Sequence, residues 1–533
     1  MTLRMAWSAV AFGVTLALLS NTAMAAPSAA DLLAKHRAFM GWSAGDPAVP
    51  GLKLTIAPGK LPDSTVRDAG TPTAANMLAI NEEYRGLLYR QTRIVGKTQT
   101  ASGFTGRVFW RSNVNANAVS LLESDAREAL SSAIVRANGA ALLDGVSRGS
   151  ARVRDRAVEI VRVTPRDGFP IDLYIDPTTG EMLRYVIRPD DVYGNSDVAI
   201  EAYKEFSPGK RVASVLRYGT RKQTLDVTHA QIATDLPDAD FTPPKPTSSW
   251  AFGTSAPIAV DEHSRRSAFG VGRSIRFKAT LNGHTGTFLL DSGAGGIIVF
   301  SNFAEQLNLP TLAASGYTGV NGGFVPAREI RVSTFAIGDN ILHDVIVQTS
   351  KSKEVDLDGI VGFDFLAQAI VDVDLVKKQM VILDPAKFEP NVGKGAVAFP
   401  VDLSSNTPSM PIKLPHGVIA HPFFDSGDDF FVLLSEDMRT SNKVVALSQK
   451  IIGDYDYRIV FGGVDGSAEE SAPCVRITRV DVGPYGYENV PICFASPKVF
   501  GKEGGLVGFD FLQHFNWTFD YPDGKFVLSP NGR

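Results

Sequence analysis

The chain contains the stretch Phe288-Leu289-Leu290-Asp291-Ser292-Gly293-Ala294-Gly295-Gly296-Ile297-Ile298-Val299, in which a carboxylate stands between two apolar runs. An ionised carboxylate in such surroundings costs several kcal/mol unless it is paired or hydrogen-bonded, so we expect Asp291 to have a function. The arrangement recurs as Pro422-Phe423-Phe424-Asp425-Ser426-Gly427, again followed by an apolar run at 430–434. Two such carboxylates in one chain can be brought together.

A second pair of segments repeats in the same order. Gly359-Ile360-Val361-Gly362-Phe363-Asp364-Phe365-Leu366 recurs as Gly505-Leu506-Val507-Gly508-Phe509-Asp510-Phe511-Leu512. Each copy leads into an apolar strand, at 371–383 and 517–528. Because both the aspartate and the glycine segments are duplicated, the sequence indicates that one structural unit occurs twice.

Composition places the chain among globular proteins of several domains. It has 533 residues, of which 44% are hydrophobic and 21% charged, and its formal net charge is −4. The length favours about three domains. The charge provides no basic field for nucleic acid or an anionic membrane, so we expect neither as a partner.

The first 25 residues have the pattern of a secretory signal peptide. Arg4 precedes an apolar run at 6–19, and Ala23-Met24-Ala25 is a small-x-small cleavage site. The run is short for a membrane span, which needs about 20 residues. We expect cleavage after Ala25, with an uncleaved anchor as the alternative. The mature protein should then be periplasmic or secreted, without stable membrane insertion.

Cys474 and Cys493 are the two cysteines of the chain. In an exported protein they are expected to form a disulfide and not a metal site, because no second cluster of ligands lies beside them. Their flanking segments alternate like neighbouring strands. The bridge should therefore join a hairpin in the second copy of the repeat.

Residues 26–245 are predicted to form a separate domain that precedes the repeats. We expect helices at 29–39 and 121–141, and a hairpin between 171–175 and 182–187 around the turn Asp176-Pro177-Thr178-Thr179-Gly180. Further strands are expected at 87–95, 106–110, 157–164, 199–206 and 211–218. A stretch rich in proline and serine then marks a linker at 246–258. The two copies follow at 259–388 and 395–533.

The N-terminal order of one helix and a meander of long strands resembles the curved half-barrel of periplasmic lipoprotein-carrier domains. That resemblance is diffuse and carries no catalytic motif. It implies either a cavity for a lipid or peptide or a folding and positioning domain, and we favour the second. The domain could equally be a pro-segment, a substrate-recruiting domain or a spacer.

Two apolar-apolar-Asp-Ser-Gly segments, each with a later apolar-apolar-Gly loop, resemble the two lobes of a retropepsin-like or pepsin-like aspartic peptidase. The resemblance covers about residues 255–533. It implies a catalytic dyad of Asp291 and Asp425 that shares one proton and activates water, with no cofactor, metal or covalent intermediate. The residues implied to support the dyad are Ser292, Gly293, Ser426, Gly427, Gly362 and Gly508.

The peptidase resemblance also implies a flap over the substrate. Tyr317-Thr318-Gly319-Val320-Asn321-Gly322-Gly323-Phe324 has the glycines of a mobile hairpin, and Tyr317 is a substrate-binding candidate. The segment 460–466 holds the corresponding place in the second copy. An ordinary glycine-rich surface hairpin remains the alternative for each.

The second copy departs from the family pattern at Asp428-Asp429, where a small or hydroxyl residue is usual. Two more carboxylates would raise the pKa values of the dyad, or would turn toward solvent. This departure leaves open a catalytically inactive protein that binds peptide or lipid on a protease-like scaffold.

Other motifs have structural explanations that we prefer. Gly145-Val146-Ser147-Arg148-Gly149 matches G-x-S-x-G but lacks the strand before and the helix after it that a nucleophile elbow needs. His416 and His421 are expected to be surface residues, since no H-E-x-x-H is present. Asp364 and Asp510 should cap helix N-termini.

The sequence thus predicts a mainly β protein with an α+β N-terminal domain, a curved half-barrel-like domain followed by a bilobal aspartic-protease β domain. The expected activity is that of a monomeric aspartic endopeptidase of the bacterial cell envelope, acting on a polypeptide substrate.

Overall fold

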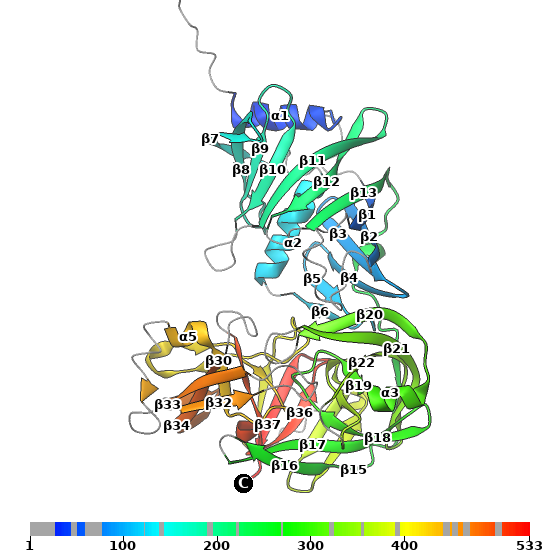
Figure 1. Cartoon of the computed structure of the whole chain (residues 1–533), viewed down its shortest axis with the longest axis vertical. Coiled ribbons are helices and arrows are strands. Elements are labelled where there is room, and N and C mark those ends of the chain that lie inside the picture. Colours follow the sequence, from blue (N-terminus) through cyan, green and yellow to red (C-terminus); the bar gives the residue numbers. More distant parts are fainter. Residues whose placement is uncertain are drawn as a thin grey trace, which may run out of the picture.

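The computed structural model describes residues 27–43, 51–58, 77–121, 123–137, 143–188, 196–219, 223–267, 270–318, 324–352, 356–389, 395–440, 448–449, 457–461, 470–495 and 504–532. The predicted signal peptide lies outside these residues, as do the tips of both expected flap hairpins. Figure 1 shows an N-terminal β-domain next to a β-rich region that holds both copies of the repeat. The expected fold class is confirmed: large curved antiparallel sheets dominate both parts.

One antiparallel sheet of 13 described strands forms the N-terminal domain. Its first six strands run outward from β1 to β6, the chain crosses through a helix, and β7 to β13 return so that β13 pairs with β1. The strands are β1 (Leu52–Pro58), β2 (Met77–Arg85), β3 (Leu88–Val95), β4 (Thr98–Phe104), β5 (Phe109–Ser112), β6 (Ala118–Ser120), β7 (Gly145–Val153), β8 (Arg156–Val163), β9 (Ile171–Ile175), β10 (Met182–Ile187), β11 (Ser196–Ser207), β12 (Lys210–Tyr218) and β13 (Gln223–Ile232).

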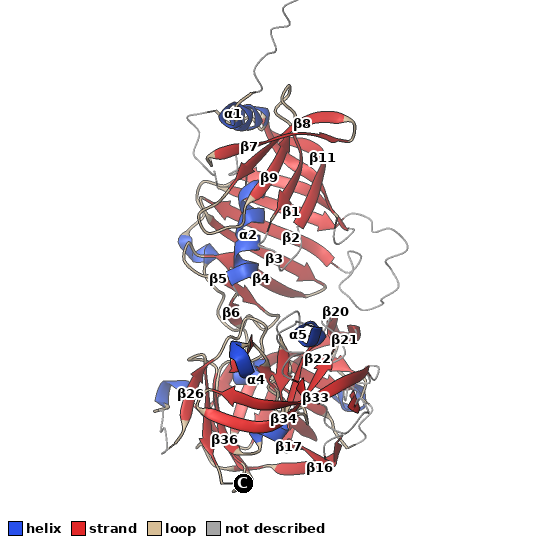
Figure 2. Ribbon diagram, turned by 90° about the vertical axis from the view of Figure 1, so that its left-hand side faces the viewer, coloured by secondary structure: helices blue, strands red, loops and turns tan. Residues whose placement is uncertain are grey.

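Two helices pack on this sheet. Helix α1 (Ala29–Phe39) has the predicted bounds, and Ser28 begins it with a capping box to Asp31. Helix α2 (Glu123–Arg136) lies within the predicted 121–141. Its buried face, which includes Leu130 and Ile134, joins the same apolar core as the inner faces of the strands. Figure 2 shows α2 lying along the sheet.

Two hairpins have turns whose residues explain their geometry, and the turn between β9 and β10 is as predicted from the sequence. Between β9 and β10, Asp176 Oδ1 accepts hydrogen bonds from the amides of Thr178 and Thr179, and Gly180 has a φ of +77°. Asn282 and Gly283 have φ values of 47° and 88°. A pair of positive φ angles gives a tight two-residue hairpin turn.

The first copy of the repeat forms a sheet of nine described strands. These are β14 (Ser249–Ala251), β16 (Asp261–Ser267), β17 (Gly270–Leu281), β18 (His284–Leu290), β19 (Ile297–Phe300), β20 (Thr311–Thr318), β21 (Phe324–Ile337), β22 (Asn340–Ser350) and β23 (Gly359–Val361). Helices α3 (Ser301–Leu307) and α4 (Phe363–Leu366) follow β19 and β23.

The second copy forms another sheet of nine described strands. These are β27 (Ile412–Lys413), β28 (Ile419–Ala420), β29 (Phe423–Phe424), β30 (Val432–Ser435), β31 (Ser448–Gln449), β32 (Tyr457–Phe461), β33 (Glu470–Val482), β34 (Tyr485–Ala495) and β35 (Gly505–Val507). Helix α5 (Glu436–Thr440) follows β30, and α8 (Phe509–Leu512) follows β35 just as α4 follows β23.

A six-stranded sheet joins the two copies through the antiparallel pair β24 and β36. Its strands are β15 (Ile258–Ala259), β24 (Ile370–Asp374), β25 (Gln379–Leu383), β26 (Val397–Pro400), β36 (Phe515–Asp520) and β37 (Lys525–Pro530). Buried side chains from both copies form one continuous core over this sheet. Within the described residues, no helix has the length and apolar character to cross a membrane.

The segment between the domains takes part in the later sheets. Within the expected linker at 246–258, β14 pairs with β22 and β15 begins a pairing with β25. These pairings attach the connecting segment to the first copy of the repeat.

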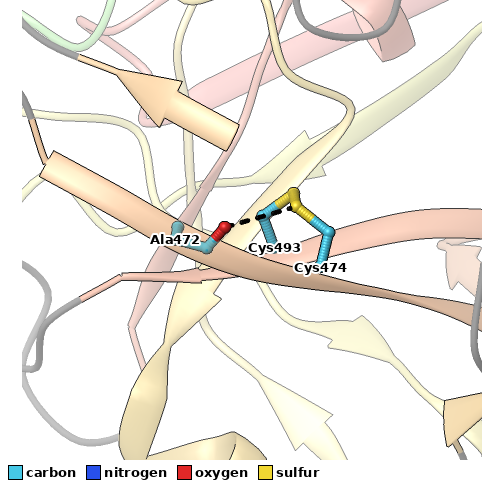
Figure 3. Close-up of a disulfide and its surroundings, with 3 residues drawn as sticks. All are labelled: Ala472, Cys474 and Cys493. Carbon is cyan, nitrogen blue, oxygen red and sulfur yellow. Dashed lines mark hydrogen bonds between the residues drawn. A yellow bond between two sulfur atoms is a disulfide. The ribbon is translucent and has the colours of Figure 1, made fainter. Parts of the chain in front are cut away.

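The expected disulfide is present (Figure 3). Cys474 on β33 and Cys493 on β34 are directly opposite in the register of an antiparallel pair. The bridge therefore joins a hairpin of the second copy, where both cysteines are buried.

Candidate active site

Each copy places its aspartate at the end of a strand that pairs with the short strand before the later glycine loop. Strand β23 runs parallel to β18 and antiparallel to β19, so the Asp291 turn passes over the end of β23. The Asp291 amide donates to Val361 O at 3.0 Å. In the second copy β35 lies between β29 and β30 in the same way, and the Asp425 amide donates to Val507 O at 2.9 Å. The structure thus repeats the local geometry as well as the sequence.

Two serines bind the aspartate turns to each other. Ser292 Oγ donates to Phe424 O at 2.7 Å, and Ser426 Oγ donates to Leu290 O at 2.9 Å. Each hydroxyl also accepts the backbone amide of the opposite serine at 3.0 Å. Both serines are at most 1% exposed, so these four hydrogen bonds are protected from water. They hold the two turns face to face.

The glycines after the serines allow this close approach. The amide of Gly293 donates to Asp291 Oδ1 at 2.8 Å, and that of Gly427 donates to Asp425 Oδ1 at 2.9 Å. A Cβ atom on either glycine would lie 2.5 Å from the carboxyl carbon of the opposite aspartate. A side chain at either position would therefore push the aspartates apart.

Asp291 and Asp425 form a coupled carboxyl pair. The two carboxyl groups lie close enough for each to shift the pKa of the other. Burial raises the pKa of both groups, and the charge of Asp291 raises the pKa of Asp425 further. The pair therefore retains one proton at pH values where isolated aspartates have lost theirs, and the two ionisation steps belong to the pair.

Gly362 and Gly508 pack against the aspartate turns. A Cβ atom on Gly362 would lie 2.2 Å from Ala294 O and 2.8 Å from Asp291 O. A Cβ atom on Gly508 would lie 2.7 Å from Asp428 O. Neither glycine has a positive φ, so space and not backbone conformation requires glycine here.

The unusual Asp428-Asp429 pair lies beside the carboxyl pair. The charge of Asp428 raises the pKa of Asp291, in the direction expected from the sequence, while Asp428 Oδ1 accepts the Phe430 amide at 2.9 Å. Asp429 is 8% exposed, so it does not turn outward to solvent. Its charge helps to raise the pKa of Asp510 to about 6, after the larger effect of burial.

Tyr317 lies on β20 in the first copy. Its hydroxyl donates to Ser350 Oγ at 3.0 Å, and its ring packs on a small apolar cluster that includes Leu289. The hairpin tip at 319–323 lies outside the described residues, as does most of the second expected flap at 460–466. A substrate-binding role for Tyr317 therefore stays a prediction.

One residue near the pair was not identified from the sequence. Tyr521 is 4% exposed, and its hydroxyl has no hydrogen-bond partner among the described residues. Burial raises its pKa, and the charges of Asp291 and Asp425 raise it further. No sequence signal marks this tyrosine, which simply follows an apolar strand.

Asp364 and Asp510 lie in the first turns of α4 and α8, as expected, but neither of them caps its helix. Gly362 and Gly508 occupy the N-cap positions, and neither α4 nor α8 has a side-chain cap. The Asp364 carboxylate instead accepts hydrogen bonds from the side chains of Asn113 and Asn117 in the N-terminal domain. The sequence near Asp364 does not show partners this distant. The alternating asparagines at 113, 115 and 117 were the one visible signal of a polar contact, but the sequence does not say with which residue.

The described residues do not support the serine-nucleophile motif or the histidine pair as functional sites. Ser147 lies exposed on β7, an edge strand of the N-terminal sheet, and so is not on a strand-to-helix turn. His421 is exposed, and the side chain of His416 is not described. Among the described residues, no three or more histidine, cysteine or acidic side chains are grouped as metal ligands.

Comparison with known proteins gives one family match. The model of the aspartyl protease family matches residues 277–365, which include Asp291, Gly362 and Asp364. No curated protein matches. Two solved structures match part of the chain at low identity. A LolA superfamily protein from Nitrosomonas europaea has 14% identity and a TM-score of 0.31, covering 41% of this chain and 98% of its own.

The second solved structure is a DUF1329 family protein from Desulfovibrio piger ATCC 29098, with 11% identity and a TM-score of 0.28, covering 40% of this chain and 95% of its own. Scores this low carry no argument about function. The family match covers only the first copy of the repeat, and over that copy the chain is similar to aspartyl proteases.

Proposed function

We propose that the chain is an aspartic endopeptidase of the bacterial cell envelope. The observation that carries the proposal is the pair Asp291 and Asp425, in contact on two turns that Ser292 and Ser426 bind to each other. A buried carboxyl pair costs free energy to maintain, so a protein has little reason to build one except to use it.

The pair supplies a base and an acid at once. The ionised carboxyl takes a proton from a water molecule as the water oxygen attacks the peptide carbonyl carbon. The protonated carboxyl gives its proton to the carbonyl oxygen, which forms a tetrahedral diol. The carboxyl that took the proton from water then gives it to the amide nitrogen while the C–N bond breaks. The other carboxylate takes a proton from one diol hydroxyl as the product carboxylic acid forms, so the pair again holds one proton. Gly293 and Gly427 keep the acceptor oxygens oriented through their amides.

Export is part of the proposal. The disulfide between Cys474 and Cys493 is typical of an oxidising compartment, and the sequence at 1–25 has the pattern of a signal peptide. We propose that the mature protein is a periplasmic or secreted monomer, because one chain already supplies both halves of the carboxyl pair.

The test is a digest of a peptide library by the purified protein, with peptide products identified by mass spectrometry. We expect cleavage that is abolished by a statine-type transition-state mimic and by Asp291→Asn or Asp425→Asn. Cleavage that survives in both variants would refute the assignment. Absence of cleavage by the wild-type protein, together with peptide or lipid binding, would favour the inactive binding protein.

A further inference from the structure

A loop of the N-terminal domain presents three asparagines to the first copy of the repeat. The loop joins β5 to β6, and its residues Asn113, Asn115 and Asn117 alternate along it. Asn115 is 0% exposed and Asn117 is 2% exposed. Val119 on β6 is buried in the core shared by the two copies. Figures 1 and 2 both show β6 at the end of the domain that meets this region.

The loop fixes the orientation of its own amides. Asn113 Oδ1 accepts the backbone amides of Asn115 at 3.0 Å and of Asn117 at 3.2 Å. Because its oxygen is engaged inside the loop, Asn113 directs its nitrogen outward, where Nδ2 donates to Asp364 Oδ1 at 2.6 Å. Asn117 Nδ2 donates to the same oxygen at 2.8 Å, and Gln368 Nε2 donates to Asn117 Oδ1 at 3.0 Å.

Asn115 binds the main chain of the first copy at two points. Its Oδ1 accepts the Ile346 amide at 2.7 Å, and its Nδ2 donates to Ile346 O at 2.8 Å. Its own carbonyl oxygen accepts the Thr247 amide at 2.9 Å. Breaking such a fully satisfied buried network would leave several polar groups without partners, at about 1–3 kcal/mol each. The two domains are therefore held in one relative position.

Asp364 connects this network to the Asp291 turn. Its Oδ2 lies 3.0 Å from the position that a Cβ atom of Gly296 would take, so the carboxyl group touches the end of the turn. The amide of Gly362 donates to Gly296 O at 3.1 Å, and the amide of Phe363 donates to Ala294 O at 2.9 Å. Burial raises the pKa of Asp364 to about 6, and the asparagine donors oppose that rise.

A second contact reaches the base of the expected flap. The Lys97 amide, in the turn between β3 and β4, donates to Leu312 O on β20 at 2.9 Å. Gly96 in the same turn has a φ of +54°, and a Cβ atom there would lie 2.4 Å from Leu312 O. The N-terminal domain thus contacts both the turn under Asp291 and the hairpin beside it.

In the second copy, no hydrogen bond found among the described residues joins Asp510 to the N-terminal domain. Asp510 corresponds to Asp364 in the repeat, but the groups that shift its pKa are Asp429, His514 and Arg273, all outside the N-terminal domain. The two copies therefore provide a comparison within one molecule: Asp364 is bound by asparagines of the N-terminal domain, and the groups whose charges shift the pKa of Asp510 lie outside that domain.

We propose that the N-terminal domain is a permanent part of the active site and that Asn113, Asn115 and Asn117 are positioning residues for Asp291, acting through Asp364 and Ile346. On this proposal residues 26–245 are not a removable pro-segment. The kinetic readout rests on the proposed peptidase function, whereas the exchange readout below is independent of it.

The kinetic test compares Asn117→Ala with Asn81→Ala in the full-length protein. Asn81 lies on β2 in the same domain, away from the loop, so its variant controls for a general effect on the domain. We expect Asn117→Ala to lower kcat about 10- to 100-fold with little change in KM, because the carboxyl pair is misplaced while the cleft still binds substrate. Asn81→Ala should retain wild-type kinetics.

The structural test is hydrogen exchange in the same variants. Asn117→Ala should speed exchange of the Asp291, Gly362 and Phe363 amides and leave unchanged the corresponding amides at 425, 508 and 509. Equal acceleration in both copies would mean general destabilisation and overturn the proposal, as would no acceleration in either. Gln368→Ala removes the donor to Asn117 Oδ1 and to Ser248 Oγ but keeps both asparagine donors to Asp364. It is the milder variant and should give a smaller change in the same direction.

The outcomes separate the two proposals. A wild-type protein that cleaves nothing, with exchange accelerated only in the first copy, would refute the peptidase and leave the positioning role standing. An active Asn117→Ala protein with wild-type kcat and exchange would refute the positioning role and leave the peptidase intact.

Discussion

The hydroxyls of Ser292 and Ser426 each act as donor and acceptor between the two aspartate turns. Replacing Ser292 with alanine would leave Phe424 O without its donor and the Ser426 amide without its acceptor, both in a buried place. We expect Ser292→Ala to destabilise the protein by about 1–3 kcal/mol for each group left unsatisfied. Thermal unfolding followed by circular dichroism measures this change.

Ser435 provides the matched control for that substitution. It is also 0% exposed, but its hydroxyl has no hydrogen-bond partner among the described residues. Ser435→Ala should therefore have little effect on the melting temperature. If the two variants lost stability equally, the cross-linking role of Ser292 would be wrong.

Asp428 is predicted to contribute to the acidic limb of the pH profile. Burial is the main cause of the raised pKa of Asp291, and the negative charge of Asp428 raises that pKa further. Asp428→Asn keeps the oxygen that accepts the Phe430 amide but removes the charge, so the pKa of Asp291 should fall. The acidic limb of the kcat/KM profile should then move to lower pH, because the ionised base persists in more acid solution. A limb that stays in place or moves upward would contradict this.

Among single residues, those with an unusual local sequence context could be identified from the sequence. Asp291 and Asp425 were identifiable because a charge interrupts an apolar run, and the neighbouring glycines because small residues mark close approach. The partners of Asp364 were not identifiable, since Asn113 and Asn117 are 251 and 247 positions away. A local pattern gave the wrong interpretation there, a helix cap, because the competing donors come from another domain.

Among the elements, strands and hairpins with turn chemistry were predictable to within a few residues. Strands β9 and β10 have the predicted bounds because Asp176 and Gly180 stop both at a defined turn. Strand β23, which lies between β18 and β19, was not expected as a central strand. Parallel pairing joins segments far apart in sequence, so the hydrophobic pattern alone does not show where such a strand inserts.

The disulfide of the hairpin β33–β34 is predicted to stabilise the second copy. Its disulfide closes a loop with a sequence separation of 19, for which the chain-entropy estimate is about 3 kcal/mol. Replacing Cys474 and Cys493 together by alanine should lower the stability of the second copy by about that amount. Thermal melting measures the loss. Reductant should destabilise the wild-type protein similarly and leave the double variant unchanged; a wild-type protein insensitive to reductant and to the double substitution would contradict the prediction.

At the scale of the molecule, the two copies are joined by backbone pairing as well as by the carboxyl pair. The six-stranded sheet takes β15, β24 and β25 from before residue 390 and β26, β36 and β37 from after residue 394. Across its centre, Val371 faces Phe519 and Val373 faces Trp517, and all four are fully buried. The covalent connection at 390–394 is therefore not what holds the copies together.

This organisation predicts that the protein survives a cut between its copies. With a site for a specific protease inserted at 390–394, the two fragments should elute as one species from a size-exclusion column and should retain hydrolytic activity. The physical reason is that separation would expose the edges of β24 and β36. It would also break the four buried hydrogen bonds that the hydroxyls of Ser292 and Ser426 make between the copies.

As the control, Trp517→Ala removes a buried side chain from the shared sheet and should allow the cut fragments to separate. Fragments of the otherwise unchanged protein that separate after cleavage would show that the copies depend on the connection and not on the sheet.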